Sequence, residues 1–255
     1  MQSLQPTLTR PKRLQKPHLL RLASAIETAG GLAPLCAPEN LPASGFHELL
    51  AAAPGDECIM LAFAFSMAAK ALGDTSKSLC FCGPVSEEQE RGELYGSGLA
   101  GLGIQPERLL MITAAKEKDL LWTIEEAVSS GAFGAVIGTL GPKERLYDFA
   151  ASRRLKLRVT AKEAPLFLIR HRTGGGATAA HGRWRVSALP SRSQGQHGSY
   201  PLLGPPRLQL GLERMGGLPP QAWEMEFDAA RGFLMAPLLE DGPAREAGRR
   251  RRQAA

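Results

Sequence analysis

The chain has 255 residues, with 31 lysines and arginines against 25 aspartates and glutamates, which gives a formal net charge of +6. This length fits one large domain or two small ones. Hydrophobic residues make up 44% of the chain, but no apolar run approaches the roughly 20 residues of a membrane-spanning helix. This pattern excludes a protein with membrane-spanning helices. The first residues lack the apolar stretch of a secretory signal, so we expect a cytoplasmic protein.

Charge divides the chain into regions. Residues 1–44 carry five basic and two acidic side chains, residues 45–172 carry fifteen and sixteen, and residues 173–255 carry eleven and seven. The middle is therefore nearly neutral, whereas both flanks are basic. With the distribution of proline, glycine and apolar residues, this predicts four regions: a basic N-terminal tail, helix and linker (1–44), an α/β core (45–172), a β-rich extension (173–236) and a disordered basic tail (237–255).

A short amphipathic helix is predicted near the N-terminus. Leu19, Leu22 and Ile26 repeat at the spacing of one helical face, and the pattern ends at Gly30 and Gly31. The prolines that follow indicate a linker before the core.

Strands and helices alternate through the core. Near-continuous apolar segments predict strands, and longer amphipathic or apolar segments between them predict helices. The predicted strands cover residues 46–50, 78–82, 109–113, 134–138 and 165–170, and the predicted helices cover 58–72, 87–102, 119–130 and 145–163. Asp119 is the expected N-cap of the third helix. The fold class is therefore α/β, a doubly wound and mainly parallel sheet flanked by helices.

The pattern changes after the glycine run at 174–176. Residues 184–188, 207–213 and 222–228 alternate apolar and polar side chains, which is typical of half-exposed antiparallel strands. The segment 190–206 is rich in Ser, Gly and Pro, so we expect a mobile loop there.

Most motifs of known chemistry are absent or lie in the wrong context. Residues 96–101 spell GxGxxG, but a polar segment precedes them where a dinucleotide-binding fold needs a strand. Cys80 and Cys82 share one side of a predicted strand, where buried thiols behave as small hydrophobic groups. The histidines stand singly, so no metal site and no cofactor is predicted.

The segment around residue 55 has the layout of a phosphate-binding loop without its binding residues. A strand, a small-residue loop and a long helix follow one another, but Gly55, Asp56 and Glu57 stand where Gly-Lys-Ser/Thr is required. The two carboxylates fill the positive end of the helix dipole and would repel a triphosphate.

The order of several segments resembles the ImuA family of RecA-like accessory proteins in bacterial damage-induced mutagenesis. The resemblance covers residues 45–172 and continues more loosely to residue 228. It rests on segments 47–56, 93–96, 103–110, 122–131, 135–138 and 151–155, and then on 183–186, 206–210 and 223–228.

A more distant resemblance to the RecA recombinase implies a RecA-like core whose sheet also ends in antiparallel strands. It places the phosphate-gripping lysine at Glu57 and the magnesium-binding hydroxyl at Cys58. The water-activating glutamate falls at about Pro84, and the aspartate that ends the fourth core strand falls at Gly138. Residues Gly55 to Cys58 thus form a degenerate phosphate loop, and we expect no ATP hydrolysis and no enzyme activity.

The same resemblance raises the question of DNA contact. The segments that match the two DNA-holding loops of the recombinase, 139–148 and 170–183, look too short for a continuous filament. Basic side chains that can contact phosphates gather nearby. They are Arg153, Arg154, Arg170, Arg172, Arg183 and Arg185. A solvated helix face and a core tryptophan explain the same residues equally well.

The resemblance implies an adaptor in SOS-induced translesion synthesis. Its implied partners are an ImuB-like Y-family protein and an error-prone C-family polymerase. Leu19, Leu22 and Ile26 would offer a contact for a partner or for a homo-oligomer. Two alternatives remain open: a RecA-like nucleotide-binding regulator, and a cell-division inhibitor resembling SulA.

Overall fold

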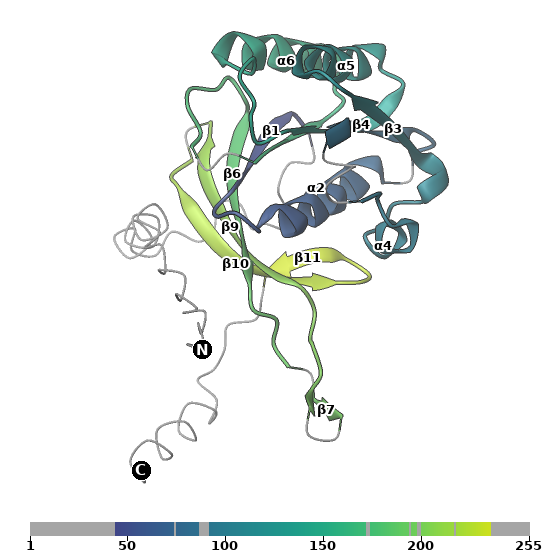
Figure 1. The fold of residues 1–255 in the computed structure, drawn as a ribbon, viewed down its shortest axis with the longest axis vertical. Coiled ribbons are helices and arrows are strands. Elements are labelled where there is room, and N and C mark those ends of the chain that lie inside the picture. The colour runs from purple at the N-terminus through teal and green to yellow at the C-terminus, as the bar shows by residue number, and fades with distance from the viewer. Residues whose placement is uncertain are drawn as a thin grey trace, which may run out of the picture.

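The structure is a computed structural model that describes residues 44–235, except 74, 87–91, 172–173, 194, 198–199 and 217. The leading feature is a nine-stranded sheet with strand order β11-β10-β9-β6-β1-β5-β4-β2-β3 (Figure 1). A separate two-stranded sheet joins β7 and β8. The predicted α/β class with a mainly parallel sheet and antiparallel C-terminal strands is confirmed.

The strands from β1 to β6 pair with one another in parallel. β1 lies in the middle, between β5 and β6, and β4, β2 and β3 follow toward one edge. These strands are β1 (Phe46–Ala51), β2 (Ser78–Pro84), β3 (Leu109–Ala114), β4 (Phe133–Leu140), β5 (Leu166–Arg170) and β6 (Gly182–Leu189). The five strands predicted in the core are therefore present, each within a few residues of its expected bounds.

β6 corrects one prediction. It pairs in parallel with β1 and antiparallel with β9, and its first six residues are buried. It is therefore an interior strand and not a half-exposed one. The expected alternation fails because both faces of the sheet are covered at this position. The antiparallel part continues through β9 (Arg207–Met215), β10 (Gln221–Asp228) and β11 (Gly232–Met235), the last of which was not predicted.

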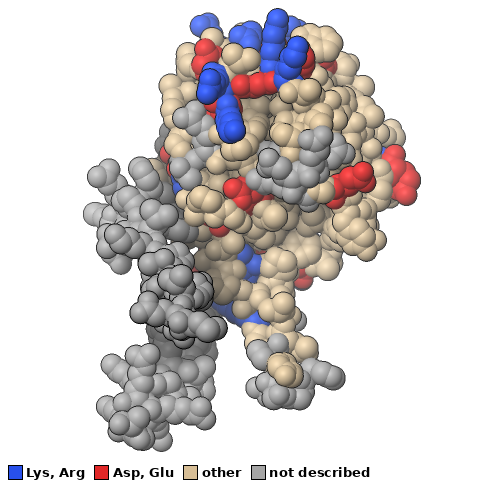
Figure 2. All heavy atoms as spheres, in the orientation of Figure 1, with Lys and Arg blue, Asp and Glu red and all other residues tan. Residues whose placement is uncertain are grey.

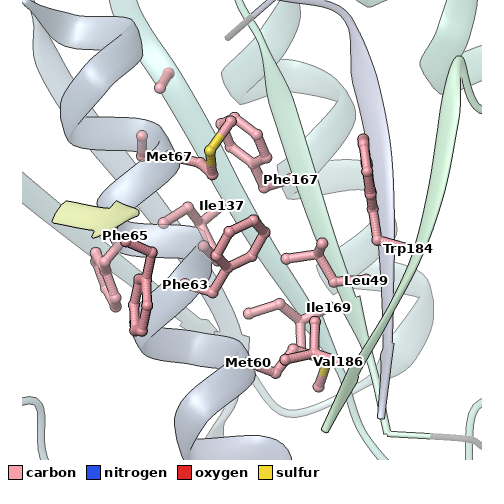
Figure 3. Close-up of a cluster of buried hydrophobic side chains, with 14 of the residues drawn as sticks. Leu49, Met60, Phe63, Phe65, Met67, Ile137, Phe167, Ile169, Trp184 and Val186 are labelled. Atoms are coloured by element: carbon pink, nitrogen blue, oxygen red, sulfur yellow. The ribbon is translucent and has the colours of Figure 1, made fainter. Parts of the chain in front are cut away.

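Helix α2 (Glu57–Leu72) packs on one face of the sheet. Its apolar side chains form much of the hydrophobic core on this face, where Met60, Phe63 and Met67 point between α2 and the sheet (Figure 3). The sheet curls so that β11 lies against α2 from below, and the rings of Phe63 and Phe233 are 6.0 Å apart (Figure 1). α2 is thereby enclosed on two sides.

Helices α5 (Glu117–Ser130) and α6 (Phe149–Lys162) cover the opposite face. One face of α5 is buried, through Leu120, Leu121, Ile124, Ala127 and Val128, and the N-cap is Lys116 and not the predicted Asp119. α6 begins later than predicted because Asp148 caps it, accepting a hydrogen bond from the amide of Ala151 at 2.8 Å.

Two glycine-rich segments also differ from prediction. Within the predicted helix 87–102, the described residues are helical only in the short α4 (Gly96–Gly101), and Gly92 has a φ of +81° that a helix does not allow. The predicted loop 190–206 contains the hairpin strands β7 (Gln196–His197) and β8 (Tyr200–Pro201). Among the helices of the described part, none is long and apolar enough to cross a membrane.

Candidate functional site

The carboxyl ends of the parallel strands meet the amino end of α2. In open α/β sheets, ligands bind at this edge, near the point where the strand order reverses. The direction of the connections reverses near β1: β1 leads through α2 to β2 on one side, whereas β5 leads past β1 to β6 on the other side. The loop after β1 and the ends of β2 to β5 therefore form the place where a ligand site is expected.

The loop between β1 and α2 keeps its amides occupied. Ala53 donates its N–H to Asp56 Oδ2 at 2.8 Å, and Gly55 donates to Glu57 Oε2 at 2.7 Å. Ala52 donates to the carbonyl of Val186, and Asp56 donates to the carbonyl of Ala53. Since Pro54 has no N–H, every loop amide from residue 52 to residue 56 has a partner within the chain.

Asp56 also joins this loop to the sheet. Its Oδ1 accepts the N–H of Ala188 in β6 at 2.9 Å, and the residue is only 7% exposed. A phosphate-binding loop works by offering free N–H groups to an anion. Here two carboxylates of the chain take the place of that anion, so the geometry opposes binding of a phosphate.

A cavity of about 170 Å³ lies beside this loop. Its walls come from the start of α2, the carboxyl ends of β2 to β5 and the segment before α4. The lining residues are Glu57, Cys58, Leu61, Phe81, Gly83, Pro84, Gly92, Glu93, Leu94, Met111, Thr113, Thr139, Ile169 and His171. The walls are mostly apolar, and the charged groups of the lining are two carboxylates.

The cavity brings together several of the positions implied by the RecA resemblance. Glu57, Cys58 and Pro84 are among its lining residues. Gly138 does not, because a Cβ there would lie 2.6 Å from Cδ1 of Ile124 in α5, on the opposite face. Its neighbour Thr139 lines the cavity and lies 3.1 Å from His171 Nε2. An aspartate at residue 138 would therefore require the side chain of Ile124 to shift.

A buried network of charged residues is centred on Glu48 in β1. Glu48 in β1 is completely buried, and its Oε2 lies 2.8 Å from a guanidinium nitrogen of Arg183 in β6. Its Oε1 accepts hydrogen bonds from the hydroxyls of Thr178, at 2.6 Å, and Tyr147. Both oxygens of this carboxylate are thus satisfied, which is the condition for burying a charge.

A second pair extends the network. Arg170 at the end of β5 pairs with Glu144, and both Arg170 and Arg183 donate to the carbonyl of Gly175. Burial lowers the pKa of Arg170, but the hydrogen bond and charge of Glu144 outweigh it and the pKa is raised. Burial, and then the charge of Glu48, raises the pKa of Tyr147, so its hydroxyl stays protonated and donates. The network therefore fixes the loops that follow β4 and β5.

The arginines predicted to contact DNA fall into two groups. Arg170, Arg183 and Arg185 are 4%, 9% and 7% exposed, and Arg185 pairs with Glu213. The structure thus gives these three an internal role instead of the expected DNA contact, because their guanidiniums are held by carboxylates. Arg153 and Arg154 lie exposed on α6, where Arg154 forms a solvent-accessible pair with Glu125. Basic side chains gather over α5 and α6, at the top of Figure 2.

Other predicted residues lie outside the described part. They are Leu19, Leu22 and Ile26 of the N-terminal helix, together with Arg172. Within the described part, no group of His, Cys, Asp and Glu is arranged to hold a metal ion. Cys80 and Cys82 are buried on one side of β2 with their sulfurs 3.6 Å apart, as predicted.

Sequence reasoning missed the buried network. Glu48 lies in a predicted strand but was assigned no role. A carboxylate inside an apolar strand nevertheless indicates that it needs a buried partner. Its partners Tyr147 and Thr178 lie 99 and 130 residues away in the chain. Only the fold brings them together.

The chain is similar to Protein ImuA from two strains of Caulobacter vibrioides, NA1000 / CB15N and ATCC 19089 / CIP 103742 / CB 15. Each is 32% identical over 230 residues, which cover 83% of this chain and 88% of the relative. Among solved structures, SulA from Pseudomonas aeruginosa is 22% identical and matches with a TM-score of 0.38, over 50% of this chain and 98% of that chain. No protein-family model matches.

Proposed function

Because the chain belongs to the ImuA family, which acts in damage-induced mutagenesis, we propose that it is a non-catalytic adaptor in translesion DNA synthesis. In this role it binds an ImuB-like Y-family protein and supports an error-prone C-family polymerase. The adaptor works by presenting surfaces to its partners, and it neither binds nor hydrolyses a nucleotide.

The main support for the non-catalytic part of this proposal is the loop after β1, which we call the filled loop because carboxylates of the chain occupy its amides. The amides of Ala53 and Gly55 donate to Asp56 and Glu57, so a triphosphate would have to displace two carboxylates and meet their charge. The cavity beside the loop has no lysine or arginine among its described lining residues to pair with a phosphate. Binding of a nucleotide in the manner of RecA is therefore disfavoured twice.

A RecA-like origin of the core accounts for the same geometry. β1 lies between β5 and β6, the loop after β1 leads into a long helix, and the sheet ends in antiparallel strands. We interpret the segment from Gly55 to Cys58 as a phosphate loop that has lost its function. The fold then serves as a scaffold.

Calorimetry tests the loss of nucleotide binding. The full chain is titrated with ATP and magnesium, and we expect no heat of binding. The double variant D56G/E57K, which removes the filling carboxylates and adds a lysine, shows whether the carboxylates are the cause. Micromolar binding of ATP by the unaltered chain would overturn the non-catalytic assignment and favour a nucleotide-binding regulator.

Co-purification tests the adaptor role. The full chain and the ImuB-like protein of the same bacterium are expressed together, with only one of them tagged. We expect both proteins to elute as one complex in size-exclusion chromatography. Removal of the predicted N-terminal contact by L19S/L22S/I26S shows whether that segment is needed. Retention of a tubulin-like division protein without the ImuB-like protein would instead support the SulA-like alternative.

A further inference from the structure

The cavity beside the filled loop has the character of a protein-binding site. Leu61, Phe81, Met111 and Ile169 supply apolar wall, and the cavity lies at the sheet edge where ligands of α/β proteins bind. It is far larger than the volume of roughly 10–15 Å³ that one water needs. An organic group is the occupant that fits it.

The charge of the lining residues indicates which kind of organic group the cavity favours. Glu57 and Glu93 line the cavity, and no lysine or arginine is among the described lining residues. An anion would therefore meet the repulsion of two carboxylates, whereas a cation beside an apolar group would be attracted. Nucleotides and DNA phosphates are poor occupants by the same reasoning.

The surroundings point to a macromolecule and not to a small cation. The lining residue Met111 is 38% exposed, and Tyr95, which follows the lining residue Leu94 in the sequence, is 75% exposed. Exposed aromatic and methionine side chains beside a pocket are typical of protein interfaces, where one anchoring side chain fills the pocket.

We propose that this cavity binds a segment of a protein partner that inserts an apolar side chain and places a lysine or arginine at the mouth, against Glu57 and Glu93. This inference rests on the proposed adaptor function, for which it names the binding site. The cavity beside the filled loop thus receives a peptide side chain.

Cys58 allows a direct test, because it is exposed and lines the cavity, whereas Cys80 and Cys82 are buried. In the full chain carrying C36S, Cys58 undergoes disulfide exchange with three peptides, each of which carries a terminal cysteine as a mixed disulfide with a small thiol. The Cys58 thiolate bonds to the peptide sulfur and the small thiol leaves. The peptides differ only at their centre. The centres are Lys-Leu-Lys, Glu-Leu-Glu and Lys-Ser-Lys. Mass spectrometry measures the fraction of tethered peptide at equilibrium with a reductant.

We expect the Lys-Leu-Lys peptide to tether about tenfold more strongly than either other peptide, a difference of about 1.4 kcal/mol. The variant E93K should remove the preference for Lys over Glu, and T113W, which fills the cavity, should remove the preference for Leu over Ser. The matched controls E126K and T160W lie exposed on the opposite face and should change nothing. Equal tethering of all three peptides, or unchanged preferences in E93K and T113W, would overturn the proposal.

Binding of the ImuB-like protein separates this inference from the adaptor role. We expect that protein to slow maleimide labelling of Cys58 in the C36S chain about tenfold and to bind E93K and T113W more weakly. Unchanged labelling in a stable complex would overturn the cavity as its site and leave the adaptor role standing. Absence of any complex, with the peptide preferences intact, would overturn the adaptor role alone.

Discussion

Glu48 is the residue on which the interior charges depend. It is completely buried, and its partner Arg183 has a side chain that is 10% exposed. Removal of one member of a buried pair leaves an uncompensated charge, which costs more than the pair itself contributes. The variant E48Q keeps the size of the side chain and an acceptor for Tyr147, so that it removes mainly the charge.

We expect E48Q to lower the free energy of unfolding by about 3–5 kcal/mol, measured by urea denaturation. The control E224Q breaks a pair with Arg207 in which Glu224 is 54% exposed, and should cost no more than about 1 kcal/mol. Equal effects of the two substitutions would show that Glu48 does not anchor the network.

His181 makes the stability depend on pH. Its Nδ1 accepts the N–H of Phe46 at 3.0 Å, which requires that nitrogen to be unprotonated. Burial, and then the charge of Lys156, lowers its pKa below the usual 6.5. The unfolded chain therefore binds more protons than the folded chain as the pH falls below 6.5, so acid destabilises the fold through this residue.

The variant H181N tests this dependence, since its amide oxygen can accept the same hydrogen bond without titrating. Urea unfolding is compared at about pH 7.5 and about pH 5.5. We expect the unaltered chain to lose more stability over this interval than H181N does. An equal loss in both chains would assign the acid sensitivity to other groups.

At the scale of elements, the turn from β1 into α2 is held by Asp56. Its two oxygens accept the amides of Ala53 and of Ala188 in β6, so one side chain fixes the loop and joins it to the sheet. D56A leaves both amides without that acceptor, and we expect a loss of about 1.5–3 kcal/mol in the free energy of unfolding. E57A removes one exposed hydrogen bond to Gly55 and should cost less than about 1 kcal/mol. Reversed magnitudes would contradict this assignment.

The elements show what sequence could and could not predict. The five core strands carry apolar runs that indicate a buried strand whatever the rest of the fold, and the sequence predicts all five. β6 was predicted to be half-exposed because Arg185 and Ser187 alternate with apolar residues over 184–188. Arg185 is buried because Glu213 in β9 pairs with it, and the preceding Arg183 is buried against Glu48 in β1. A periodic pattern cannot reveal such distant partners.

The candidate functional site was likewise only partly predictable from the sequence. The carboxylates at Asp56 and Glu57 are visible in the sequence, because they stand in a loop of recognisable layout. The cavity beside them is not, because its walls come from α2 and from four strands whose order only the sheet defines. The orientation of Gly138 toward Ile124 likewise follows from the packing of α5 on β4.

At the scale of the whole molecule, the two faces of the sheet differ. α2 and the curled strand β11 cover one face, where the acidic cavity opens near the start of α2. α5 and α6 cover the other, where Lys and Arg gather (Figure 2). A segment bound in the cavity would therefore leave the basic side chains of α5 and α6 uncovered.

The salt dependence of DNA binding tests whether the exposed arginines of α6 contact DNA. Each phosphate contact releases counterions, which lowers the slope of log K against log salt by about 0.7 for single-stranded DNA. If Arg153 and Arg154 each contact one phosphate, R153E/R154E should reduce the magnitude of the slope by about 1.4, measured by fluorescence anisotropy with an unstructured oligonucleotide. The control K70E/R231E makes the same change of net charge on the α2 side and should leave the slope nearly unaltered. Equal slopes for R153E/R154E and the unaltered chain would show that α6 does not contact DNA, and would leave any DNA attraction to other parts of the chain.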